Sequence, residues 1–120
     1  MATFPMILIG LIALLHGYIL WLEMFAWTTR APKIFTSIPK EMFEPTRALA
    51  ANQGLYNGFL CAGLVWSLFV RDAVWAENIA TFFLACVAIA GMYGAATASR
   101  KIFFVQTLPA LITLVLLLLL

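Results

Sequence analysis

The side chains best suited to chemistry in this sequence are polar groups that interrupt long apolar segments. Glu23 is the most costly of them, because a carboxyl group deep in a membrane segment must be paired or protonated. His16 lies seven residues earlier and therefore on nearly the same helical face. Titratable groups in a low-dielectric site are suited to proton transfer, so Glu23 and His16 are the candidate catalytic residues if the protein is an enzyme.

Other polar residues recur at a similar depth in the later apolar segments. Counted inward from the basic residues that end each segment, several of them fall roughly 8 to 10 Å inside one boundary, at about 1.5 Å per residue of helix. Such a layer predicts a ligand-binding site near one face of a membrane. Its candidate residues are Glu23, Asn52, Gln53, Tyr56, Asn57, Tyr93, Gln106 and His16.

Two structural alternatives stay open for these residues. A long basic side chain near the boundary can reach Glu23, so an ion pair with Arg47 or Arg30 explains this carboxyl group as well as a ligand site does. The polar side chains between residues 52 and 57 equally suit hydrogen bonds between helices, which hold membrane bundles together.

The composition favours a membrane protein. Of the 120 residues, 65% are hydrophobic and 10% are charged, and the mean hydropathy is +1.05. A soluble domain has about a quarter of its residues charged, so an ordinary soluble enzyme is disfavoured. The net charge of +2 is too small for a nucleic-acid binder. The sequence contains no HExxH, CxxC or GxGxxG motif, so no residue is assigned to a metal and any cofactor is unknown.

Four apolar segments set the expected architecture: residues 3–29, 48–70, 75–99 and 102–120. Each is long enough to cross a hydrocarbon core of about 30 Å as a helix. The short connections RDAV and SRK make the last three helices antiparallel neighbours, whereas the first connection is long and rich in proline. We therefore predict an all-α integral membrane four-helix bundle with up-down antiparallel topology and a long first loop, forming a single domain over residues 1–120.

The small residues of the helices predict association. Four short helices enclose little core, and the faces around Gly54/Gly58 and Gly91/Ala95 suit close helix contact. We therefore expect a homo-oligomer. The other expected partners are membrane lipid and a small amphipathic ligand, and nucleic acid is not expected.

Four runs of the sequence resemble a known family: LHGYILWLEMFAW, ALAANQGLYNGFLCAGLVW, AGMYGAAT and VQTLPALITL. Together they cover nearly the whole chain and are similar to small predicted membrane proteins grouped as domain of unknown function 1304 (DUF1304). The positions that recur in that family are here His16, Glu23, Asn52 to Gly58, Gly91 to Gly94 and Gln106 to Pro109. The resemblance implies the membrane architecture and no particular activity.

A shorter resemblance concerns the start of the second segment. Arg47, Asn52 and Tyr56 are similar to the Arg-x3-Asn-x2-Glu-Tyr pattern of the MAPEG family, which are membrane-bound four-helix proteins of eicosanoid and glutathione metabolism. The spacing differs by one residue and the glutamate is missing. By analogy of architecture, this resemblance implies a trimer that binds glutathione between its subunits.

The function hypothesis that follows is a small polytopic membrane protein. We expect it to bind a small amphipathic or lipid-like ligand in a polar intramembrane pocket near the cytoplasmic side. One alternative is a membrane enzyme that acts on a lipid-soluble substrate, through Glu23 and His16 or through MAPEG-like chemistry. Another alternative is a small transporter subunit.

The basic residues predict the orientation. Arg71 alone flanks the second connection, whereas six basic residues flank the first and third: Arg30, Lys33, Lys40, Arg47, Arg100 and Lys101. By the positive-inside rule, the first and third connections face the cytoplasm and both termini lie outside, in a bacterial inner (plasma) membrane. A phosphatase reporter fused after Leu120 should therefore be active. Activity of a reporter that works only in the cytoplasm would contradict this orientation.

Overall fold

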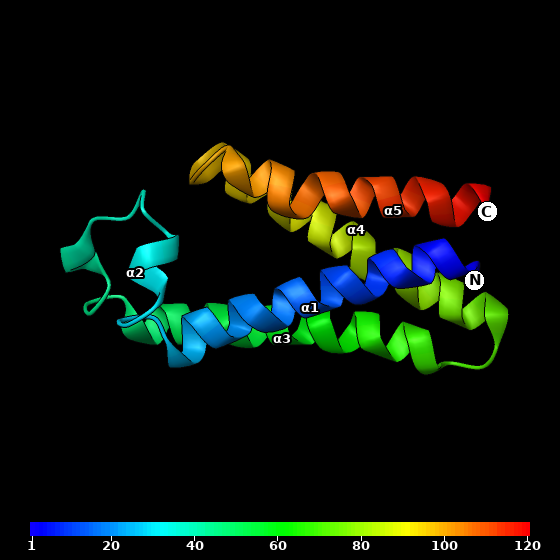
Figure 1. The fold of residues 1–120 in the computed structure, drawn as a ribbon, viewed down its shortest axis with the longest axis horizontal. Helices are drawn as coiled ribbons and strands as arrows, with labels where there is room; N and C mark the ends of the chain where they lie inside the picture. Colours follow the sequence, from blue (N-terminus) through cyan, green and yellow to red (C-terminus); the bar gives the residue numbers. More distant parts are fainter. The chain divides into compact units, whose positions relative to one another are not determined.

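The computed structural model describes residues 1–120, and its regular structure is entirely helical. The all-α prediction is therefore confirmed. In chain order, the elements are α1 (Thr3–Phe25), α2 (Ala31–Ile34), the 3₁₀ turn η1 (Lys40–Met42), α3 (Arg47–Phe69), α4 (Ala73–Thr97), the π-helical turn η2 (Phe103–Thr107) and α5 (Leu108–Leu119) (Figure 1).

The first helix ends at Phe25, four residues before the expected residue 29. The reason lies in the backbone after it, where the carbonyl of Ala26 accepts hydrogen bonds from the amides of Thr29, Arg30 and Ala31 at 2.9–3.3 Å. The chain thus turns around a single carbonyl group. Pro32 follows within the first turn of α2, where its missing amide is tolerated.

The chain forms two compact units, which are described separately. One unit comprises Met1–Leu14 and Leu60–Leu120, and the other comprises Leu15–Phe59. The long helices α1 and α3 each contribute one half to each unit.

The larger unit has a continuous apolar core. Helices α4 and α5 lie side by side in it (Figure 1). Its fully or nearly fully buried side chains are Ile9, Ile12, Ala13, Leu64, Ala80, Leu84, Val87, Ala88, Ala110 and Leu117. At the start of α4, the carboxylate of Asp72 accepts a hydrogen bond from the amide of Trp75 at 3.0 Å and thereby caps the helix.

The π-helical turn η2 interrupts the last apolar segment. Pro109 has no amide, so it cannot form the α-helical hydrogen bond to the carbonyl of Val105. The chain widens one turn earlier, and the amide of Leu108 bonds to the carbonyl of Phe103. The hydroxyl of Thr107 then donates to the carbonyl of Ala88 at 2.9 Å, which ties η2 to α4.

The smaller unit contains the end of α1, the first connection and the start of α3. Gly54 lets the two helices approach closely, since a Cβ atom at this position would lie 2.6 Å from Cγ of Met24 and 3.2 Å from the carbonyl oxygen of Leu20. Phe43 and Ala31 of the connection are buried together with Leu22 of α1. The indole of Trp27 packs on Phe43 and donates to the hydroxyl of Thr46 at 3.0 Å.

The glycine-lined surfaces that suggested association are occupied within the chain itself. A Cβ atom at Gly58 would meet Cδ1 of Leu20 at 2.5 Å, and one at Gly91 would clash with Thr107. These glycines therefore no longer argue for an oligomer. The homo-oligomer stays a prediction.

Two helices, α1 and α4, are long and apolar enough to cross a membrane, by length and composition. Phe103–Leu119 forms a shorter apolar helical segment, and α3 is less apolar because Asn52, Gln53 and Asn57 lie in it. The integral membrane four-helix bundle is therefore still a prediction at this point.

Replacing Gly91 by alanine should destabilise the protein. The added Cβ atom would meet the hydroxyl of Thr107 and lie 2.8 Å from its backbone nitrogen, so α4 and η2 would have to separate. We expect a loss of about 1–3 kcal/mol in unfolding free energy, measured by denaturant titration in detergent.

The matched control is Gly10→Ala, because the nearest atom to its new Cβ would be Cδ1 of Leu68 at 4.0 Å. This variant should be as stable as the wild type or more stable by up to about 1 kcal/mol, since alanine is the better helix former. Equal effects of the two substitutions would contradict the close packing of η2 on α4.

Candidate functional site

A carboxyl group and an amide meet where α1 and α3 approach each other in the smaller unit. The side-chain amide of Asn57 donates to Oε1 of Glu23 at 2.6 Å, and it also donates to the backbone carbonyl of Gln53 at 3.2 Å. The first of these bonds joins α1 to α3 through their side chains. Gly54 and Gly58 flank Asn57 on α3, and the close helix contact that they permit lets this short side chain reach Glu23.

The Glu23 carboxyl group has an amide for a partner and no cation. Asn57, which is 8% exposed, donates a hydrogen bond to Glu23. The one ion pair of the chain joins Arg47 to Glu44 at 3.8 Å, between two exposed side chains. An ion pair of Glu23 with Arg47 or Arg30 is therefore not the arrangement found in the structure. The bond from Asn57 uses Oε1, so the second carboxylate oxygen is the atom with which Glu23 can bind another molecule.

Three of the expected site residues lie on α3 without contacting Glu23 through a hydrogen bond. Asn52 and Gln53 are exposed, and Tyr56 is 60% exposed beside the ring of Phe59. Asn57 thus turns inward and the other three turn outward, so they do not form one polar surface in this unit.

The remaining expected residues lie elsewhere. His16 is fully buried on α1, two turns before Glu23. Tyr93, on α4, is 73% exposed, and Gln106 is half-buried in η2; both belong to the larger unit. The common depth of Tyr93 and Gln106 with Glu23 stays a prediction. No three His, Cys, Asp or Glu side chains lie together as ligands for a metal ion.

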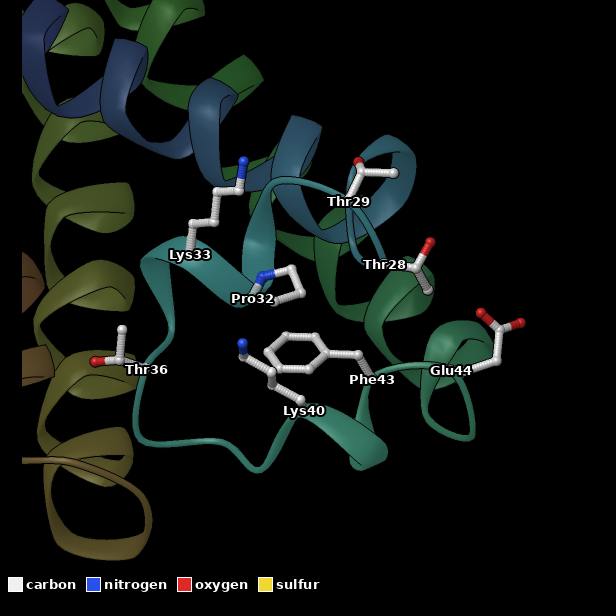
Figure 2. A pocket seen from close by; sticks show the side chains of 8 residues that line it. All are labelled: Thr28, Thr29, Pro32, Lys33, Thr36, Lys40, Phe43 and Glu44. Carbon is white, nitrogen blue, oxygen red and sulfur yellow. The ribbon is translucent and has the colours of Figure 1, made fainter.

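The first connection holds a feature that the sequence analysis did not predict. A hollow of about 730 Å³ is lined by Thr28, Thr29, Pro32, Lys33, Thr36, Lys40, Phe43 and Glu44. Figure 2 shows these side chains arriving from the turn after α1, from α2 and from the segment around η1. The available signal was the recurrence of threonine, lysine and proline in the connection, but only the fold brings these residues around one space.

Comparison with known proteins gives a family and no activity. A family model described as "Protein of unknown function (DUF1304)" matches residues 10–118. The chain is also 31% identical over 117 residues to "Uncharacterized protein YpaA" of Lactococcus lactis subsp. lactis (strain IL1403), which covers 96% of this chain and 97% of that protein. No solved structure matches the chain. The family match includes Glu23, Asn57 and the whole first connection.

The geometry predicts that Glu23 is coupled energetically to Asn57 and not to Arg47. In a double-mutant cycle of Glu23→Leu with Asn57→Leu, we expect an interaction energy of about 0.6 to 1.7 kcal/mol, the range for hydrogen bonds between membrane helices. The measurement is the unfolding free energy of wild type, single variants and double variant in one detergent.

The matched cycle combines Glu23→Leu with Arg47→Gln. Its two effects should add within about 0.5 kcal/mol, because the side chain of Arg47 is exposed and pairs with Glu44. Strong coupling in this second cycle with none in the first would contradict the observed geometry.

Proposed function

The chain belongs to the DUF1304 family, and we propose that it is an integral membrane protein that binds a small amphipathic or lipid-like ligand at Glu23 and Asn57. The observation that supports this proposal best is the 2.6 Å hydrogen bond between these two side chains, since Glu23 lies on α1, a helix long and apolar enough to cross a membrane. The proposed site opens toward the cytoplasmic side.

The surface of the helices supports a location in lipid. Large apolar side chains stand exposed along them, among them Leu14, Phe25, Phe69, Phe82 and Leu119. Water would make such a surface unfavourable, and monomeric soluble proteins rarely expose apolar patches of this extent. We therefore propose that the four apolar segments, α1, α3, α4 and η2 with α5, all cross the membrane, with the basic first and third connections in the cytoplasm.

The chemistry of the pair specifies the kind of ligand. One oxygen of Glu23 is bonded to Asn57, and the other is free to accept a hydrogen bond. A ligand that offers a hydroxyl or amino group would satisfy this oxygen, and an apolar body would remain in the surrounding lipid or between side chains. The proposed ligand is therefore an amphiphile with a hydrogen-bond donor in its polar part.

A catalytic role is the second candidate. It would use Glu23 or His16 for proton transfer on a lipid-soluble substrate, and the complete burial of His16 favours a group kept away from bulk water. Chemistry of the MAPEG type rests on Arg47, Asn52 and Tyr56, which are all exposed. A transporter subunit is the third candidate.

The test is ligand retention in the variant Glu23→Gln, measured by native mass spectrometry of protein purified with its lipids. A ligand donor left without its acceptor costs about 1–3 kcal/mol, so we expect retention of the bound mass to fall about fivefold or more. The variant should still fold, because glutamine can accept the bond from Asn57.

The matched control is Glu41→Gln, which makes the same change on the exposed turn η1 and should leave retention unchanged. Wild-type retention by folded Glu23→Gln protein would refute the assignment of the site. Absence of any bound amphiphile from the wild type would refute it as well.

A further inference from the structure

The hollow in the first connection carries an excess of positive charge. Lys33 and Lys40 contribute two ammonium groups to its wall, and Glu44 contributes one carboxylate. Glu44 is itself paired with Arg47 at 3.8 Å, outside the hollow, whereas neither lysine lies within ion-pair distance of an acid. Both lysines are therefore available to an anion from outside the chain.

The other lining groups complement these charges. Thr28, Thr29 and Thr36 supply hydroxyl groups that can donate to anionic oxygens. Pro32 and Phe43 give the hollow an apolar part. The volume of about 730 Å³ is much larger than a single phosphate group needs, and six of the eight lining residues are exposed, so the hollow is an open depression in the surface of this unit. The lining thus suits an anionic head that carries an apolar or carbon-rich body.

The floor of the hollow is held in place by packing. Phe43 is buried and lies 4.8 Å from Trp27, measured between ring centroids, and Trp27 in turn contacts Phe35 at 5.7 Å. The indole of Trp27 is also bonded to Thr46. Phe43 therefore keeps its position when a ligand enters, and this part of the lining loses little conformational entropy on binding.

We infer that this hollow binds a phosphate group that is esterified to an organic molecule. Lysine binds phosphate as a point charge, and basic residues beside a membrane helix attract anionic lipid head groups. The site shares no residue with the Glu23–Asn57 pair. The inference therefore goes beyond the proposed function. The phosphate group recognised here is the same on a lipid head group and on a soluble phosphate ester, and the test distinguishes these two sources.

The test measures binding of three probes to the full chain in a neutral detergent: dioctanoyl phosphatidic acid, sn-glycerol 3-phosphate and trioctanoylglycerol. We expect phosphatidic acid to bind, with an affinity that falls as the salt concentration rises. Trioctanoylglycerol should not bind, because it has neither a phosphate group for the hollow nor a hydrogen-bond donor for Glu23. Binding of glycerol 3-phosphate as tight as that of phosphatidic acid would identify a soluble ester as the source of the phosphate. Weaker binding of the soluble ester would identify the lipid.

Variants assign the binding to the hollow. The double variant Lys33→Gln with Lys40→Gln should weaken phosphatidic acid binding about tenfold or more, and Glu44→Gln should strengthen it. The matched control, Arg71→Gln with Lys101→Gln, removes the same charge elsewhere and should change affinity little. Loss of phosphatidic acid binding in Glu23→Gln, with none in the lysine double variant, would place this probe at the Glu23–Asn57 pair and overturn the inference, so the two proposals fail separately.

Three results would overturn the inference. The first is failure of both phosphate probes to bind the wild type. The second is unchanged affinity in the Lys33 and Lys40 double variant, with folding confirmed by circular dichroism. The third is an equal loss of affinity in the double variant and in its control, which would show a general charge effect.

Discussion

A carboxyl group in an apolar helix must find a partner, and this requirement organises the smaller unit. Glu23 meets it with the amide of Asn57 at 2.6 Å. The short asparagine side chain reaches only if the two helices nearly touch, and Gly54 makes that approach possible because no Cβ atom stands against Met24. The hydrogen bond between Glu23 and Asn57 therefore depends on glycine at position 54, which has no Cβ atom to hold α1 and α3 apart.

Sequence reasoning identified the helical class and the unusual carboxyl group but did not predict its partner. Hydropathy locates the ends of a helix to within a few residues. The end of α1 at Phe25, and not at residue 29, is set by the turn that follows it, which hydropathy does not describe. The choice between Asn57 and Arg47 as the partner depends on helix phase and separation, which a single sequence does not specify. Helix phase also explains why the polar residues of α3 do not form the single surface that we expected: the side chain of Asn57 is buried and that of Tyr56 is exposed.

Two other features arise from contacts between distant residues. The hollow in the first connection requires Phe43 to pack on Trp27, which lies 16 positions earlier (43 − 27). The π-helical turn could be anticipated from Pro109 as a bend, but its position depends on the bond from Thr107 to Ala88. The two proposed ligand sites both lie in the unit formed by residues 15–59, and each suits the polar end of an amphiphile.

The most direct test of the central claim is labelling of carboxyl groups by carbodiimides in intact membranes, mapped by peptide mass spectrometry. If Glu23 lies in an apolar site for an amphiphile, the apolar dicyclohexylcarbodiimide should modify it and a water-soluble carbodiimide should not, while the exposed Glu41 and Glu44 show the reverse preference. Removal of bound lipid should increase the labelling of Glu23. Modification of Glu23 by the water-soluble reagent alone, at the rate of Glu41, would contradict the account.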